Sequence, residues 1–299
     1  MKAKAQAQVR TASITLKDWV QDFGLLVKFR LSTFVVFSSL VAYIIAAGSA
    51  FATVPFILLL AGGFMITFAA NIFNEILEAD FDRVMERTAN RPLAAQRWTS
   101  SSALVLAGLF SIIGIVLLAL LNPLTSFIGT LSLVTYSFLY TPLKRYSPIS
   151  VVVGAIPGAL PVLIGMIAHD GVLTSAALFL FAIQFIWQFP HFWAIGFLSY
   201  DQYQKAGYKL LPEENDQIDR RLGSQTLVYT CLLLPVIGIG FAMGLVSWIG
   251  VIGLTLVSTY FIWKAWMFYK NFDKGSARAL MFSSFVFLPL ALFALWLGM

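Results

Sequence analysis

The chain has 299 residues, of which 59% are hydrophobic and only 11% are charged. Several apolar runs reach the roughly 20 residues that cross a bilayer, which predicts a polytopic membrane protein without a separate soluble domain. The net charge of +6 does not indicate a nucleic-acid partner, because the basic residues are spread over the loops between apolar runs. The single cysteine, Cys231, excludes an internal disulfide and a cysteine-based metal site.

The apolar segments form one integral-membrane domain over residues 1–299. Residues 1–24 are polar and mildly basic and lack the apolar core and cleavage site of a signal peptide, so we expect a cytoplasmic N-terminal segment. Long helices rich in Phe, Leu and Ile exclude a closed barrel, and the fold class is an all-α membrane bundle. We predict nine transmembrane helices, over residues 27–49, 53–74, 101–121, 124–141, 149–168, 172–199, 226–246, 248–268 and 279–298.

The charges predict the orientation of this bundle. With the N-terminus inside, all 20 Lys and Arg residues fall in inside segments, and the outside turns 48–53 and 121–125 contain none. This bias predicts a cytoplasmic N-terminus and, after nine spans, an outside C-terminus. Asp170 is the one acidic residue of the fourteen that falls outside. We therefore expect the charged, functional loops to face the cytoplasm. Residues 1–24 are too short and too poor in Arg and Ser for a mitochondrial presequence, which favours a prokaryotic inner membrane.

The densest group of charges lies at residues 74–92, where the second apolar run ends. Asn74, Glu78 and Asp82 are spaced four apart, which places them on one face of a helix, whereas Asp80 is turned about 200° from Glu78. Such oxygen ligands suit Mg²⁺, and guanidinium groups nearby suit a diphosphate. The alternative is a solvated loop whose charges pair with one another. The candidate diphosphate ligands are Arg83, Arg87 and Arg91.

Two further segments combine polar and apolar features. Tyr140 and the adjacent Lys144 and Arg145 close the span 124–141, where the cations either grip phosphate or anchor the helix at the membrane surface. The span 172–199 carries polar groups at membrane depth, which often mark a function. Its His191 is a candidate metal or porphyrin ligand, an acid or base, or a structural hydrogen-bonding group. The other polar side chains there are Gln184, Trp187 and Gln188.

Small residues in the span 149–168 indicate close helix packing. Gly154 and Gly158 are four residues apart, and Gly165 lies two turns further on. Small residues at this spacing let neighbouring helices approach one another. The prolines of this span, Pro157 and Pro161, are expected to shape the wall of a pocket.

Four motifs, in this order, resemble the UbiA-type intramembrane prenyltransferases. They are N-x-x-x-E-x-D-x-D-R-x-M-x-R-T-x-x-R-P at 74–92, Y-T-P-L-K-R at 140–145, a Gly- and Pro-rich run at 154–165, and W-Q-F-P-H-F-W at 187–193 followed by D-Q-Y-x-x-A-G-Y from 201. The W-Q-x-P-H-F-W element is similar to that of the heme-modifying branch. Glu78 stands where the family usually has Asp, and Gln202 replaces the second Asp of D-D-Y.

The resemblance implies the transfer of a farnesyl group from farnesyl diphosphate to a vinyl group of protoheme IX, with addition of water, which yields heme O and diphosphate. It implies one or two Mg²⁺ ions held by Asn74, Glu78, Asp82 and Asp201, with Asp82 and Asp201 converging on one diphosphate. It implies heme b as a substrate rather than a permanent cofactor, and a membrane-lipid environment. The diphosphate ligands would be Arg83, Arg87, Arg91, Tyr140, Lys144 and Arg145, and the heme ligands Trp187, Gln188 and His191.

The resemblance also implies heme A synthase or terminal-oxidase assembly proteins as partners. The alternative within the same family is a different aromatic or tetrapyrrole acceptor. The alternative from another class is a membrane transporter that uses buried polar residues as an ion path. A transporter predicts charges near the middle of the membrane, whereas this sequence keeps its charges at one face.

Overall fold

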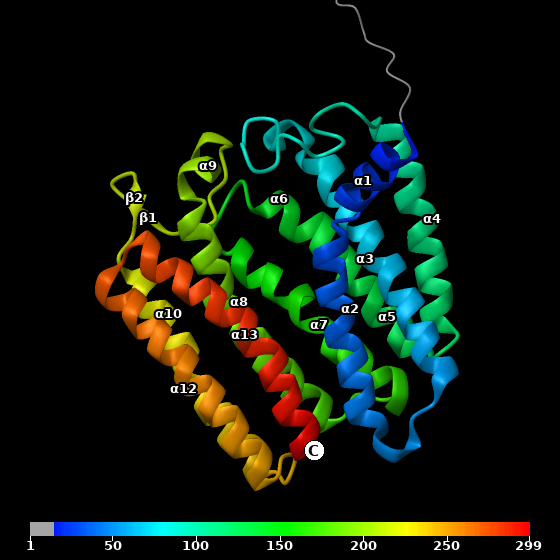
Figure 1. Cartoon of the computed structure of the whole chain (residues 1–299), viewed down its shortest axis with the longest axis vertical. Helices are drawn as coiled ribbons and strands as arrows, with labels where there is room; N and C mark the ends of the chain where they lie inside the picture. The colour runs from blue at the N-terminus through cyan, green and yellow to red at the C-terminus, as the bar shows by residue number, and fades with distance from the viewer. Residues whose placement is uncertain (1–14) are drawn as a thin grey trace, which may run out of the picture.

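The protein is described by a computed structural model that covers residues 15–299, so the first 14 residues of the predicted N-terminal segment lie outside the described residues. The described chain is a helical bundle with one short hairpin, in which Glu213 pairs with Ile218 (Figure 1). The first half contains α1 (Leu16–Leu26), α2 (Phe29–Ala47), η1 (Gly48–Ala50), α3 (Thr53–Asp82), α4 (Ser100–Ala119), α5 (Pro123–Val134), η2 (Thr135–Tyr140) and α6 (Thr141–Leu143). The second half contains α7 (Ser150–Asp170), α8 (Ser175–Leu198), α9 (Tyr200–Lys205), β1 (Glu213–Glu214), β2 (Gln217–Ile218), α10 (Arg221–Cys231), α11 (Leu233–Ala242), α12 (Trp248–Asn271) and α13 (Lys274–Gly298).

Within residues 15–299, eight helical segments are long and apolar enough to cross a membrane, with α10 and α11 together forming one of them. The predicted span 124–141 corresponds to α5, η2 and α6, which follow one another without a gap but are divided by a π-helical turn. This segment is not among the eight, and the count of nine stays a prediction. Helix α3 continues beyond residue 74, the predicted end of the second span, to Asp82, so the spaced side chains Asn74, Glu78 and Asp82 all lie on it.

Helix α1 precedes the first apolar run and was not predicted. Thr15 caps it, accepting a hydrogen bond from the backbone N–H of Asp18, whose carboxylate in turn accepts from the Thr15 N–H. Trp19 stacks on Phe23, with ring centroids 5.5 Å apart. Arg97 binds Asp22 through Nε and an Nη nitrogen, at 2.9 and 2.7 Å. The helix is therefore tied to the loop that follows α3.

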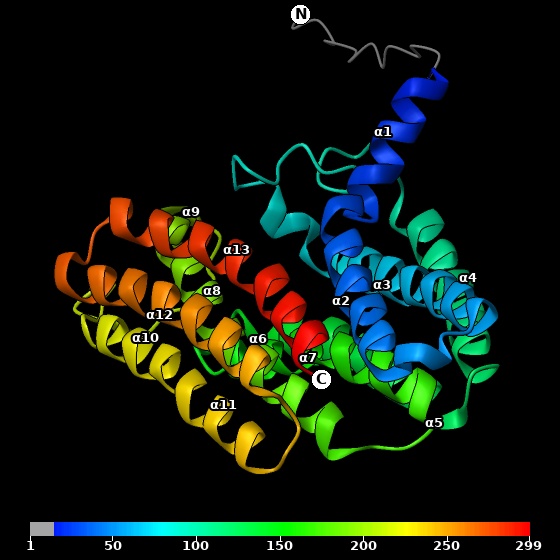
Figure 2. The ribbon, with the colours of Figure 1, turned by 60° about the horizontal axis from the view of Figure 1, so that its bottom comes forward.

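Helix α7 lies in the centre of the bundle, between α2 and α8 (Figure 2). Most of its residues are buried, from Val151 to Ala168. A Cβ atom on Gly165 would lie 2.0 Å from the backbone oxygen of Ser39 in α2, and one on Gly158 would lie 2.8 Å from the Gln188 side chain in α8. These distances confirm the prediction that small residues of this span let neighbouring helices approach closely.

The polar connections gather at one end of the bundle. The loop after α3, α6, α9 and the β1–β2 hairpin lie at the top in Figure 1, whereas the C-terminus and the turn between α2 and α3 lie at the bottom. This arrangement agrees with the separation of charged and uncharged turns in the sequence. Which end faces the cytoplasm stays a prediction from the distribution of Lys and Arg.

Candidate functional site

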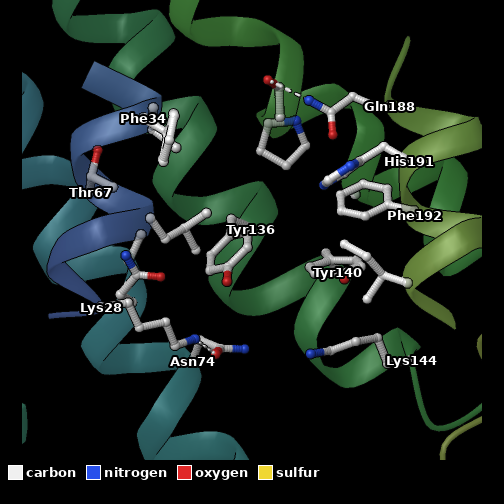
Figure 3. A pocket seen from close by; sticks show the side chains of 18 of the residues that line it. Lys28, Phe34, Thr67, Asn74, Tyr136, Tyr140, Lys144, Gln188, His191 and Phe192 are labelled. Carbon is white, nitrogen blue, oxygen red and sulfur yellow. Dashed lines mark hydrogen bonds between the residues drawn. The ribbon is translucent and has the colours of Figure 1, made fainter. Parts of the chain in front are cut away.

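A cavity of about 530 Å³ opens at the polar end of the bundle and extends between α2, α3, α7, α8 and α13. Its volume lies in the range of small-molecule sites. Figure 3 shows its polar end, with Lys28, Asn74 and Lys144, and the aromatic side chains Tyr136 and Tyr140 next to it. The polar end is lined by Lys28, Asn74, Glu78, Asp82, Arg87, Arg91, Lys144, Tyr203 and Tyr208.

One face of α3 supplies the acidic part of this cavity. Asn74, Glu78 and Asp82 all line it and are all buried, which confirms that they share a helix face. Asp80 points elsewhere, as predicted, and pairs with Arg83 at 2.9 Å on the exposed surface. Residues spaced four apart on α3 therefore reach the cavity, whereas Asp80, which lies between two of them, does not.

Each of these three side chains is matched with a cation from another segment. Lys28 donates to Asn74, and Lys144 forms an ion pair with Glu78. Arg91 binds Asp82 Oδ2 at 2.6 Å. Burial lowers the pKa of Arg91, but the carboxylates of Asp82 and Glu78 more than offset this effect, so that its pKa lies above the ordinary value. A guanidinium in this position stays charged at physiological pH.

The charge of the polar end favours an anion. Four basic side chains line it together with the two carboxylates of Glu78 and Asp82. Burial lowers the pKa of Lys28 to about 7, so one to two positive charges are in excess near neutral pH. The cations are Lys28, Arg87, Arg91 and Lys144. Because these groups lie in a mostly buried hollow, their charges are screened less than those on an open surface. A diphosphate fits this excess, and a divalent cation on the acidic face would increase it.

The residues present fit a magnesium ion. Among residues 15–299, no three His, Cys, Asp or Glu side chains cluster as a metal site. Mg²⁺, however, is commonly bound by one or two carboxylates together with substrate phosphate oxygens. Asp82 Oδ1 is buried and has no hydrogen-bond partner, and such an orphaned oxygen is suited to a cation. Glu78 and the amide oxygen of Asn74 supply further hard ligands beside it.

The π-helical turn η2 orients the wall next to the polar end. Such turns inside helices often occur at functional sites. Tyr136 and Tyr140, four residues apart, both line the cavity, with ring centroids 5.6 Å from each other. The hydroxyl of Thr141 donates to the Tyr136 carbonyl at 2.9 Å and accepts from Asn74 Nδ2 at 2.9 Å. The turn therefore also fixes the amide of Asn74.

The rest of the cavity is mainly apolar and aromatic. Helix α8 contributes Gln184, Trp187, Gln188, His191 and Phe192. The amide nitrogens of both glutamines donate to the backbone oxygen of Gly158, at 2.9 and 3.0 Å. Figure 3 shows His191 and Phe192 directed into the cavity on the side opposite Phe34 and Thr67. This wall offers flat surfaces and one imidazole to a bound molecule.

The cavity also reaches the outer surface of the bundle. Leu31 and Phe34 of α2 and Phe285 of α13 line it, and they are 48%, 56% and 43% exposed. These side chains belong to segments apolar enough to cross a membrane. An amphiphilic molecule could therefore enter from the lipid, between α2 and α13, with its polar group toward the charged end.

Three of the predicted site residues, Arg83, Arg145 and Asp201, do not line this cavity. Arg83 pairs with Asp80 and donates through Nε to the Ala94 oxygen at 3.1 Å. Arg145 donates to the Leu77 oxygen at 2.6 Å and lies over the Phe81 ring. Lys144 lines the cavity, whereas the side chain of its neighbour Arg145 is turned toward α3. Arg83 and Arg145 hold the surrounding backbone instead.

The predicted convergence of Asp201 with Asp82 is wrong. Asp201 is exposed, pairs with Lys274 at 2.8 Å and lines a different hollow beside α12 and α13. Tyr203, two residues later in α9, lines the central cavity. Two residues on a helix are separated by about 200°, so Asp201 must face away when Tyr203 faces inward.

Sequence reasoning missed three residues of the polar end. Lys28 looked like one more inside cation, although it directly precedes an apolar run. Tyr203 accepts a hydrogen bond from Arg87 at 3.4 Å. Tyr208 is buried and its hydroxyl has no hydrogen-bond partner. Burial, together with the charges of Glu78 and Asp82, raises the pKa of Tyr208, so the hydroxyl stays protonated as a donor. Both tyrosines belong to the D-Q-Y-x-x-A-G-Y motif, and this motif is the sequence feature that could have identified them as site residues.

The fold and the site together define a class: α-helical membrane proteins in which a cation-rich, acidic-faced hollow leads into an apolar chamber that extends to exposed apolar side chains of the bundle. The model of the UbiA prenyltransferase family matches residues 35–291. The chain belongs to this family.

Known proteins agree with this assignment. The chain is 42% identical to the protoheme IX farnesyltransferase of Cytophaga hutchinsonii over 274 residues, which cover 90% of this chain and 94% of the relative. It is 39% identical to the protein of the same name from Christiangramia forsetii, with 91% of each chain covered.

Solved structures share the fold. A digeranylgeranylglyceryl phosphate synthase structure superimposes with a TM-score of 0.78 at 16% identity, covering 93% of this chain and 98% of the other. A UbiA homolog from Archaeoglobus fulgidus, bound to GPP and Mg²⁺, superimposes with a TM-score of 0.64 at 14% identity, covering 92% of this chain and 99% of that one.

Proposed function

We propose that this protein transfers the farnesyl group of farnesyl diphosphate to a vinyl group of protoheme IX, with addition of water, and releases heme O and diphosphate. The observation that carries the proposal is the central cavity, in which a cation-rich, acidic-faced end leads into an aromatic chamber containing His191. The relatives named protoheme IX farnesyltransferase support the choice of acceptor.

Asn74, Glu78 and Asp82 are the proposed magnesium ligands, and Asp201 is omitted because it lies outside the cavity. When bound, Mg²⁺ would neutralise charge on the leaving diphosphate. Lys28, which donates to Asn74 in the structure, would exchange that partner for a phosphate oxygen. Lys144 and Arg91 make the same exchange from their carboxylates, and Arg87 completes the cationic ring. Such fixed charges stabilise the negative charge that develops as the C–O bond breaks.

The remainder of the cavity suits the reactive part of the substrates. Breaking the bond between farnesyl C1 and the diphosphate oxygen leaves an allylic cation, which water would capture if it reached it. The aromatic walls of Tyr136, Tyr140 and Phe192 exclude water and attract a cation through their ring faces. The vinyl carbon of the heme then bonds to C1, and water adds to the resulting heme-side cation and loses a proton.

Trp187, Gln188 and His191 are the proposed contacts to the heme. Trp187 and His191 are stacked with ring centroids 4.8 Å apart, and both line the cavity. Gln188 is already bound to Gly158 through its amide nitrogen, so its oxygen is the atom left for a ligand. This wall lies deeper than the charged end, and a prenyl chain extending from Lys144 would meet a heme seated here.

The test is an acceptor panel. Purified protein in detergent is given farnesyl diphosphate and Mg²⁺ with protoheme IX, a chlorin or an aromatic acid, and the product is identified by mass. We expect a product with protoheme IX. A product formed only with another acceptor would support prenyl transfer but would refute protoheme IX as the acceptor. No Mg²⁺-dependent release of diphosphate with any acceptor would favour the transporter alternative.

A further inference from the structure

A buried serine of α13 contacts the imidazole proposed to meet the heme. Ser284 Oγ lies 2.8 Å from His191 Nδ1, and Ser284 is fully buried. Its backbone oxygen accepts a hydrogen bond from Trp187 Nε1 at 2.9 Å. One residue of the neighbouring helix therefore holds both members of the stacked Trp187–His191 pair.

The hydrogen bonds of Ser284 determine where the His191 proton lies. Ser284 Oγ is 2.5 Å from the backbone oxygen of Met281. A carbonyl oxygen can only accept, so the single hydroxyl hydrogen must point toward it. The hydroxyl is then left as an acceptor toward His191, and the hydrogen of that bond must come from Nδ1.

We infer that Ser284 is a positioning residue that keeps neutral His191 in its Nδ1–H tautomer, so that Nε2 presents a lone pair to the cavity. This inference rests on the proposed function in one respect: it names protoheme IX, through its iron, as the molecule that Nε2 binds. An imidazole fixed by a hydrogen bond at one nitrogen is the usual arrangement of a metal-binding histidine. Figure 3 shows the His191 ring directed into the cavity.

The proposed geometry also limits what His191 can do. A neutral imidazole with its hydrogen committed to Ser284 cannot donate a proton from Nε2. It can bind a Lewis acid or accept a hydrogen bond there. His191 therefore does not act as an acid from Nε2, and the proposal assigns the Nε2 lone pair to binding of the acceptor.

The tautomer can be measured without heme. The chain has two histidines, so His169→Gln protein labelled with ¹⁵N-histidine shows His191 alone. We expect the nitrogen shifts of the wild-type site to show a protonated Nδ1 and an unprotonated Nε2. In Ser284→Ala the Nε2–H form should appear, whereas Ser284→Thr, which keeps the hydroxyl, should retain the original pattern. A wild-type His191 with its hydrogen on Nε2 would overturn the inference.

The matched control is Ser283→Ala. Ser283 is buried in the same helix, and its hydroxyl donates to the Leu280 oxygen at 2.7 Å in the same manner as that of Ser284. In an absorbance titration with protoheme IX, Ser284→Ala should bind about tenfold more weakly. Ser283→Ala should match the wild type, and equal affinities of the two alanine variants would contradict the positioning role. Absence of heme binding by the wild type would remove the heme proposal but leave the tautomer assignment standing.

Discussion

Lys28 offers the sharpest test of the diphosphate site, because sequence reasoning did not select it. It lies between α1 and α2 with a left-handed backbone (φ 47°) and donates to Asn74 at the polar end of the cavity. Replacing it by Met keeps a long unbranched side chain and removes the amine that would donate to a phosphate oxygen. The backbone strain at this position is the same for both residues, so Lys28→Met should fold normally.

The expected magnitude follows from the partner that Lys28 must release. A hydrogen bond to a charged group contributes about 1.5–3 kcal/mol. Because Lys28 gives up Asn74 to reach a phosphate oxygen, the net loss should lie near the lower value. At about 1.4 kcal/mol per tenfold change, the KM for farnesyl diphosphate should rise roughly tenfold.

The assay measures diphosphate release against farnesyl diphosphate concentration, at saturating protoheme IX and Mg²⁺. Lys270→Met is the control, since Lys270 is exposed on α12 and does not line the cavity. We expect the control to retain the wild-type KM. If Lys28→Met and Lys270→Met gave the same KM, the assignment of the polar end to the diphosphate would be refuted.

The remaining predictions concern the metal and the packing of the bundle. Asp82→Asn should lower kcat by about 10²-fold or more, because it removes a buried metal-facing carboxylate, whereas Asp80→Asn changes an exposed side chain and should leave kcat unchanged. EDTA should stop diphosphate release by the wild type, and added Mg²⁺ should restore it; activity that persists in EDTA would contradict the metal site. Gly165→Ala should destabilise the protein by about 1–3 kcal/mol in thermal unfolding, since its Cβ would lie 2.0 Å from the Ser39 oxygen. A Cβ on Gly108 would have no atom within 4 Å, so Gly108→Ala should leave the unfolding temperature unchanged.

Regular spacing made part of the site predictable. The four-residue interval of Asn74, Glu78 and Asp82 fixes a common face on any helix, and the structure brings all three to one cavity. The same rule separated Asp80 from them. Apolar runs likewise located the crossing helices, because burial in a bilayer requires length and hydrophobicity and little else.

Features that depend on tertiary contacts could not be predicted. Asp201 looked like a second metal ligand, but the position of Tyr203 in the cavity turns it outward. Lys28 gained its role from the approach of α2 to α3, which leaves no mark in local sequence. At the π turn η2, the Thr141 hydroxyl bonds the Tyr136 carbonyl and also Asn74, which lies 67 residues away in the sequence.

The central claim is most directly tested by the heme that a cell accumulates. The chain is expressed in a bacterium that cannot make heme O, and the extracted hemes are analysed by mass. The account predicts a new species heavier than heme b by one farnesyl group and one hydroxyl group, absent when Asp82→Asn is expressed to the same level in the membrane. Heme b alone, from cells that contain the folded wild-type protein and supply farnesyl diphosphate, would contradict it.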